Sequence, residues 1–184
     1  ATAKALGHEM ASRQAEFVDC SLQGCALRLG PGEELKSRLK EIGNGRSLFV
    51  LSCVGSLSSV SLRLAGYVPD SGNSRGEGEG NSAEEKSTTP HETTNDVIHL
   101  NQHFEILSLV GTICSDGLHL HISLGDRTGA VIGGHLIKGE VFTTAEILLG
   151  ELRGAELHRP LDTRTGYPEL AVRPSTSADA IPPS

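Results

Sequence analysis

The second half of the chain constrains the fold most, because it contains a close succession of short apolar runs separated by turn residues. Five of these runs read as strands, at residues 97–100, 104–114, 118–124, 130–137 and 144–152. Short strands at close spacing, with only one early helix, are typical of a mainly antiparallel sheet. We therefore expect an α+β domain with a mixed, largely antiparallel sheet and a flanking helix.

The first half of the chain supplies that helix and three further strands. Residues 25–29 alternate as a half-buried strand, whereas residues 47–56 form a nearly continuous apolar run and residues 60–66 follow at once. Between the strands, Leu35 and Leu39 recur at helical spacing, and the helix is expected to end at a Gly-Asn-Gly sequence.

The core must be aliphatic, because aromatic residues make up only 3% of the chain and Trp is absent. Residues 70–95 are almost free of apolar side chains, so burial cannot offset the entropy of ordering them. We expect a disordered insertion there, within one domain spanning residues 19–172. Residues 1–18 are expected to be a flexible arm, and residues 173–184 a disordered tail rich in Pro, Ser and Ala.

Three of the eight histidines form a candidate metal site. His119 and His121 are two residues apart in a predicted strand, so their side chains lie on one face. A hairpin centred near Thr128 would place His135 directly opposite His121, within the reach of a cross-strand pair. Three imidazoles could then bind zinc or another divalent metal and leave a coordination position open. The alternative is that the three side chains only form hydrogen bonds, since a register change of one residue would move His135 to the other face.

Charged residues within apolar runs are weaker candidates. Glu105 and Glu146 are expected either to support the metal ligands, one of them as a base, or to form structural ion pairs. Arg63 has the same two interpretations, as an anion-binding residue or as the partner of an acid. Asp126 is expected to shape the turn before Thr128.

The overall charge and the cysteines exclude several classes of protein. A formal net charge of -7 disfavours direct DNA binding by a broad basic surface. The four cysteines form no C-x-x-C pair, so neither a zinc ribbon nor a redox motif is indicated. No apolar run approaches the ~20 residues of a membrane span, and residues 1–13 do not resemble a signal peptide. We expect an intracellular protein of the cytoplasm or nucleus.

Several stretches, in order across residues 19–172, resemble the PPC domain (plants and prokaryotes conserved). They include Leu27-Arg-Leu-Gly-Pro-Gly-Glu-Glu-Leu, Gly117-Leu-His-Leu-His-Ile-Ser-Leu, Gly129-Ala-Val-Ile-Gly-Gly-His-Leu and Thr165-Gly-Tyr-Pro-Glu-Leu. The resemblance implies a homotrimer, and the three histidines match the metal-binding triplet of stand-alone prokaryotic members. Plant members follow AT-hooks and contact nuclear regulatory proteins, but this sequence has no Arg-Gly-Arg-Pro hook for the minor groove.

Three functions are compatible with these features. The first is a homotrimeric protein-interaction module, associated with transcription or chromatin through its partners, in which the metal stabilises the fold locally. The second is a small metal-dependent enzyme with its site at the subunit interface, in which a metal-bound water attacks or the ion polarises a substrate carbonyl, and Glu105 or Glu146 is the base. The third is a sensor that binds a small molecule between subunits. We favour the first because no base or nucleophile accompanies the histidines at a recognisable spacing.

Overall fold

The computed structural model describes residues 17–65 and 97–175. Most of the predicted arm, the insertion at residues 70–95 and most of the predicted tail lie outside the described residues. Ten strands and one helix follow in the order β1 (Ser21–Leu29), α1 (Leu35–Ile42), β2 (Leu48–Arg63), β3 (Val97–Leu100), β4 (Phe104–Cys114), β5 (Gly117–Gly125), β6 (Val131–Arg153), β7 (Ala155–His158), β8 (Leu161–Asp162), β9 (Tyr167–Pro168) and β10 (Ala171–Pro174).

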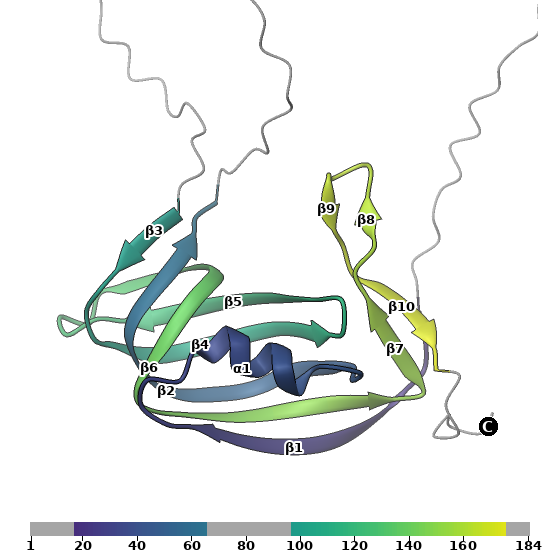
Figure 1. The fold of residues 1–184 in the computed structure, drawn as a ribbon, viewed down its shortest axis with the longest axis horizontal. Helices are drawn as coiled ribbons and strands as arrows, with labels where there is room; N and C mark the ends of the chain where they lie inside the picture. Colours follow the sequence, from purple (N-terminus) through teal and green to yellow (C-terminus); the bar gives the residue numbers. More distant parts are fainter. Residues whose placement is uncertain (1–16, 66–96, 176–184) are drawn as a thin grey trace, which may run out of the picture.

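Six strands form one strongly curved sheet in the order β1-β6-β5-β4-β2-β3 (Figure 1). Because β2 also pairs with β6, the strands β2, β4, β5 and β6 close into a ring around the core. Every pairing among the described strands is antiparallel, so the predicted antiparallel character is confirmed and the mixed component has no counterpart there.

The two longest strands each combine two predicted ones. The predicted strands at residues 47–56 and 60–66 merge into the single strand β2, which contains residues 48–56 and 60–63 of them, and residues 131–137 and 144–152 both belong to β6. The pairing of β2 with β6 shifts register at four places, which lets both long strands bend with the curved sheet. The residues between the predicted strands, which resemble turns in the sequence, therefore lie within continuous strands, at places where the pairing is irregular.

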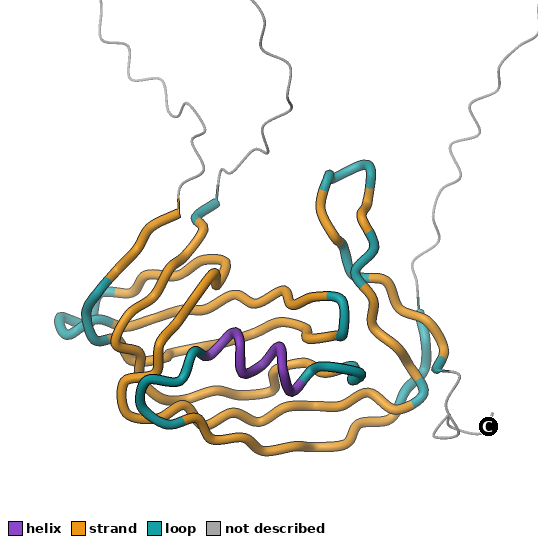
Figure 2. The backbone as a smooth tube through the Cα atoms, viewed as in Figure 1, coloured by secondary structure: helices purple, strands orange, loops and turns teal. Residues whose placement is uncertain are grey.

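The helix α1 lies across the sheet, as the backbone trace shows (Figure 2). Its N-cap is Glu34, whose carboxylate accepts hydrogen bonds from the backbone N–H groups of Lys36 and Ser37. Leu35 and Leu39 are fully buried in the aliphatic core, as the helical spacing predicted. None of the helices in the described ranges is both long and apolar enough to cross a membrane.

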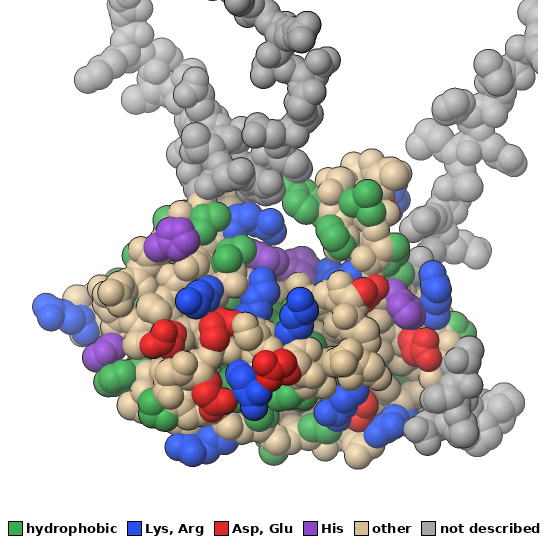
Figure 3. Space-filling view, in the orientation of Figure 1, with side chains coloured by type: hydrophobic (Ala, Val, Ile, Leu, Met, Phe, Trp, Pro, Cys, Tyr) green, Lys and Arg blue, Asp and Glu red, His purple; other side chains and the backbone are tan. Residues whose placement is uncertain are grey.

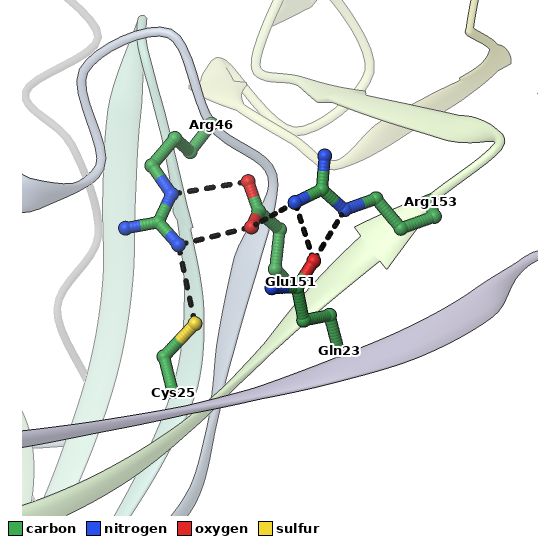
Figure 4. Close-up of polar contacts among 5 residues, drawn as sticks. All are labelled: Gln23, Cys25, Arg46, Glu151 and Arg153. Carbon is green, nitrogen blue, oxygen red and sulfur yellow. Dashed lines mark hydrogen bonds and ion pairs between the residues drawn. The ribbon is translucent and has the colours of Figure 1, made fainter. Parts of the chain in front are cut away.

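A polar cluster secures the end of β6 against β1 and the loop before β2 (Figure 4). The side chain of Glu151 is only 11% exposed and accepts two hydrogen bonds from Arg46, at 2.9 and 3.0 Å, and one from Arg153. Arg46 also donates to the Cys25 sulfur at 3.2 Å. The hydrogen bonds from Arg46 and the charges of both arginines hold the pKa of Glu151 below its ordinary value, against the effect of burial.

The chain beyond β6 forms an arm that the sequence did not predict. The β8–β9 arm, residues 159–170, projects from the end of the sheet, beyond β7 and β10 (Figure 1). The strand β10 then pairs with β7 in the antiparallel sense.

Candidate metal centre

The strand β5 places His119 and His121 on its outer face. Its alternate residues Leu120 and Ile122 point into the core and are 0% and 2% exposed. Because side chains alternate along a strand, the residues between them face outward together. The predicted division of this strand between a core face and a histidine face is confirmed.

The turn between β5 and β6 aligns the third histidine with the other two. The Asp126 carboxylate accepts hydrogen bonds from the backbone N–H groups of Thr128, at 2.8 Å, and Ala130, at 3.0 Å. These bonds close the reversal and fix the register, in which His121 lies directly opposite His135. The hairpin predicted from the sequence is thus confirmed residue by residue.

The three imidazoles converge on one point of the outer surface. The Nε2 atoms of His119 and His121 are 3.0 Å apart. The ring of His135 lies 5.2 Å from that of His119 and 5.5 Å from that of His121, measured between centroids. One possible ligand atom from each residue lies within 4.8 Å of the others, and this is the cluster of metal-binding side chains found among the described residues.

Two glycines allow His135 to occupy this place. A Cβ atom at Gly133 would lie 2.7 Å from the carbonyl oxygen of Ile122, and one at Gly134 would lie 2.8 Å from that of Arg63. At this point β6 is therefore enclosed closely by β5 on one side and β2 on the other.

The environment of His119 and His135 lowers the pKa of both side chains and so favours the neutral imidazole. Burial, reinforced by the charges of Arg63 and Lys36, lowers the pKa of His135 to about 4. Burial and the charge of Arg159 also lower the pKa of His119. The Nδ1 atom of His135 is buried and makes no hydrogen bond.

A hollow of about 320 Å³ opens beside the histidines, between the sheet and the β8–β9 arm. Figure 3 shows histidine side chains in this recess with Lys and Arg side chains close by. We call it the histidine hollow. Its lining consists of Arg63, His135, Arg159, residues 116–119 and residues 167–169.

Two arginines frame the histidine hollow. Arg63 pairs with His135 in the β2–β6 register, and its guanidinium carbon lies 5.7 Å from the centre of the Tyr167 ring. Arg159 donates hydrogen bonds to the hydroxyl of Thr112, at 2.8 Å, and to the carbonyl of Pro168, at 3.1 Å.

Of the weaker candidates from the sequence, only Arg63 lies next to the histidines. Glu105 and Glu146 are exposed on the outer face of the sheet and line none of the three hollows that border the histidines. A charged side chain among apolar residues needs an ion-pair partner only if it is buried, and both of these side chains are exposed. Arg159 and Tyr167 were missed because the β8–β9 arm brings them in from a segment with no strand-like alternation; the only signal was the Thr165-Gly-Tyr-Pro stretch.

Comparison with known proteins agrees with this fold. A curated relative, the bifunctional protein GlmU of Synechococcus sp. (strain JA-3-3Ab), is 36% identical over 182 residues, covering 97% of this chain and 25% of that protein. The chain thus spans about a quarter of that relative's length. A hypothetical protein from Salmonella cholerae-suis is 30% identical, with a TM-score of 0.65 over 85% of this chain and 96% of the other.

A metal-containing protein from Archaeoglobus fulgidus has the same fold, with a TM-score of 0.63 and 23% identity over 86% of this chain and 99% of its own. The sequence profile of the Plants and Prokaryotes Conserved (PCC) domain matches residues 20–153. The chain therefore belongs to the PCC domain family, the family that its sequence motifs resemble.

Proposed function

We propose that this chain binds a divalent metal ion through His119, His121 and His135. The observation that carries the proposal is the convergence of three ligand atoms within 4.8 Å. Two nitrogens bound to one tetrahedral zinc are about 3.3 Å apart, given Zn–N bonds of about 2.0–2.1 Å. The separation of 3.0 Å between His119 and His121 is close to this value, so small side-chain rotations would complete the set.

Two further features of the site suit a metal. The buried Nδ1 of His135 lacks a hydrogen bond, and an ion bound directly to this nitrogen would compensate it. Imidazole is a ligand for zinc, copper, iron and nickel, so zinc is the first candidate among several divalent ions. The Archaeoglobus fulgidus protein contains a metal, but its likeness to this chain supports only the fold, so the proposal rests on the histidine geometry.

Elemental analysis of the untagged protein tests this site. We expect about one transition-metal ion per chain, retained through gel filtration, and its loss in His121→Ala. His99→Ala is the matched control, because His99 lies on β3 and bonds to Ser61 rather than to the cluster. A protein that takes up no zinc, cobalt or nickel in a titration, or a control that loses metal as readily as His121→Ala, would exclude the metal site.

We further propose that the domain is a homotrimeric interaction module, because its sheet has an apolar outer face. Five of the large apolar side chains that are at least half exposed lie on the stretches of β2, β4 and β6 that pair with one another around residues 50–55 of β2. Exposed apolar patches of this kind mark interaction surfaces. We call this patch the outer apolar face. It consists of Leu51, Val54, Leu107, Val110 and Leu148.

The metal site borders this face, since Val110 pairs with His121. Sedimentation of the full chain tests the assembly: a trimer at micromolar concentration supports the proposal, and a monomer contradicts it. Partners among nuclear proteins of transcription or chromatin remain a prediction from the resemblance. Capture of such a protein that is lost when the outer apolar face is made charged would support them.

A small metal-dependent enzyme is the alternative, and the histidine hollow is the observation that favours it. Of the acidic residues, Asp116 and Glu169 line this hollow, whereas the predicted bases Glu105 and Glu146 do not. Glu169 is therefore a better candidate for the base than Glu105 or Glu146. Turnover of a carbonyl substrate that disappears in both His121→Ala and Glu169→Gln, with the trimer intact, would favour the enzyme over the module.

A further inference from the structure

We propose that the histidine hollow binds a small organic carboxylate, held between the metal ion and the guanidinium of Arg63. This inference rests on the metal site proposed above and names the class of ligand that would complete it. Its basis is the charge and shape of the lining.

The charges around the hollow are balanced only while no metal is bound. Two arginines and two carboxylates line it, so their formal charges cancel. All three proposed ligands are neutral imidazoles, which contribute no charge to offset a bound dication. The metal-loaded hollow would therefore carry a net positive charge in a partly buried place, where an unpaired charge is costly. An anion in the open coordination position removes that cost.

The two carboxylates of the lining are engaged elsewhere. Asp116 accepts hydrogen bonds from the backbone N–H of Arg159, at 2.8 Å, and from the thiol of Cys114, at 3.1 Å. Glu169 accepts one from the hydroxyl of Thr165 at 3.0 Å. Neither carboxylate belongs to the cluster of ligand atoms within 4.8 Å of one another, which the three histidines form alone, so an external anion is the simpler partner for the ion.

Arg63 is placed to receive that anion. Opposed residues in an antiparallel pair extend side chains from the same face of the sheet, so the pairing of Arg63 with His135 puts the guanidinium beside the metal site. Arginine binds a carboxylate through two parallel N–H donors. The neighbouring Tyr167 ring keeps this side chain over the hollow.

The remaining lining selects among anions. Leu118, Pro168 and the Tyr167 ring give the hollow an apolar side, and its volume of about 320 Å³ exceeds what an inorganic anion needs. A carboxylate with a short apolar chain fills both the polar and the apolar parts. Inorganic phosphate would satisfy the charge but leave the apolar part empty.

Cobalt-substituted protein provides the test, because the visible absorption of cobalt(II) changes when a ligand enters its coordination sphere. We expect butyrate to shift the spectrum of this chain saturably, and to bind more tightly than acetate or inorganic phosphate does. In Arg63→Gln we expect butyrate to bind at least about tenfold more weakly, as loss of a charge-assisted pair requires. Cobalt affinity in carboxylate-free buffer should be unchanged or higher.

Arg127→Gln is the matched control, because it removes the same charge from the exposed β5–β6 turn and should bind butyrate like the unaltered protein. Butyrate that leaves the spectrum unchanged, or that binds Arg63→Gln as tightly, would refute the carboxylate proposal while the metal site stands. Tighter binding of phosphate than of butyrate would refute the assigned ligand class. If no cobalt binds at all, the metal site itself is wrong, and this inference is wrong with it.

Discussion

Replacing Gly111 by Ala should destabilise the protein severely, because the backbone of β5 leaves no room for a side chain at this position of β4. Gly111 has φ +139°, and an added Cβ would lie 1.9 Å from the carbonyl oxygen of His119, whereas Cβ atoms essentially never come within 3.0 Å of another heavy atom. The two strands must therefore separate by about 1 Å locally, or the backbone must change conformation.

The cost can be built from two parts. Holding alanine in this region of φ costs about 1–3 kcal/mol. Separating the strands weakens one or two ladder hydrogen bonds, at about 1 kcal/mol each. The expected loss is therefore about 2–5 kcal/mol of the free energy of unfolding, a large share of the roughly 5–15 kcal/mol that holds a domain folded. Because Gly111 lies between the pairs Val110–His121 and Thr112–His119, metal affinity should fall as well.

Urea unfolding followed by circular dichroism measures this loss, at one fixed protein concentration because assembly contributes to stability. Gly24→Ala is the matched control: Gly24 also lies in a strand, but an added Cβ there meets nothing within 4 Å. We expect the control to change stability by no more than about 1 kcal/mol. If Gly111→Ala lost as little as the control, the close approach of β4 and β5 described above would be incorrect.

Three further predictions concern other parts of the molecule. Glu151→Gln should lower the free energy of unfolding by about 2 kcal/mol in urea, since it breaks a charge-assisted bond to Arg46. Because folding lowers the pKa of Glu151, the stability that this carboxylate provides is present above its ordinary pKa of 4.5 and is lost as the pH falls through the folded pKa. The variant should therefore lose less stability in acid than the unaltered protein does. Zinc at a hundred times its dissociation constant should stabilise the protein by about 2.7 kcal/mol, and should not stabilise His135→Ala, as thermal melts would show. Leu148→Glu should convert the proposed trimer to monomers in sedimentation, whereas Leu161→Glu, which alters a still more exposed leucine on the β8–β9 arm, should leave it intact; the reverse result would place the interface elsewhere.

The histidine site could be predicted because it depends on local rules. Alternation along β5 assigns His119 and His121 to one face, and the turn at Asp126 fixes the register that adds His135. No long-range information is needed, because all three residues lie within one hairpin. The same local rules correctly gave the helix, whose buried Leu35 keeps to the expected face.

The long strands could not be predicted because their continuity depends on tertiary packing. Residues 138–140 contain a glycine between charged residues and read as a loop, yet β6 runs through them. An added Cβ at Gly139 would lie 3.2 Å from the Leu57 side chain, so the glycine fits β6 against the core rather than ending the strand. The β8–β9 arm escaped prediction for a related reason, since its two-residue strands are too short for any periodicity to register.

The strand β6 changes its neighbouring strand at His135, and this change places the proposed metal ligands beside the charge of Arg63. His135 is the residue at which β6 passes from pairing with β5 to pairing with β2, so His121 lies on one side of it and Arg63 on the other. The strands β2 and β5 do not pair with each other, so it is β6 that brings the proposed ligand His121 and the cation Arg63 together. If a metal and an anion both bind here, each must strengthen the binding of the other by the same factor, since coupling between two sites is reciprocal. A titration of cobalt at rising butyrate concentrations measures that factor directly, and a value of one would mean that His135 joins two independent features rather than one composite site.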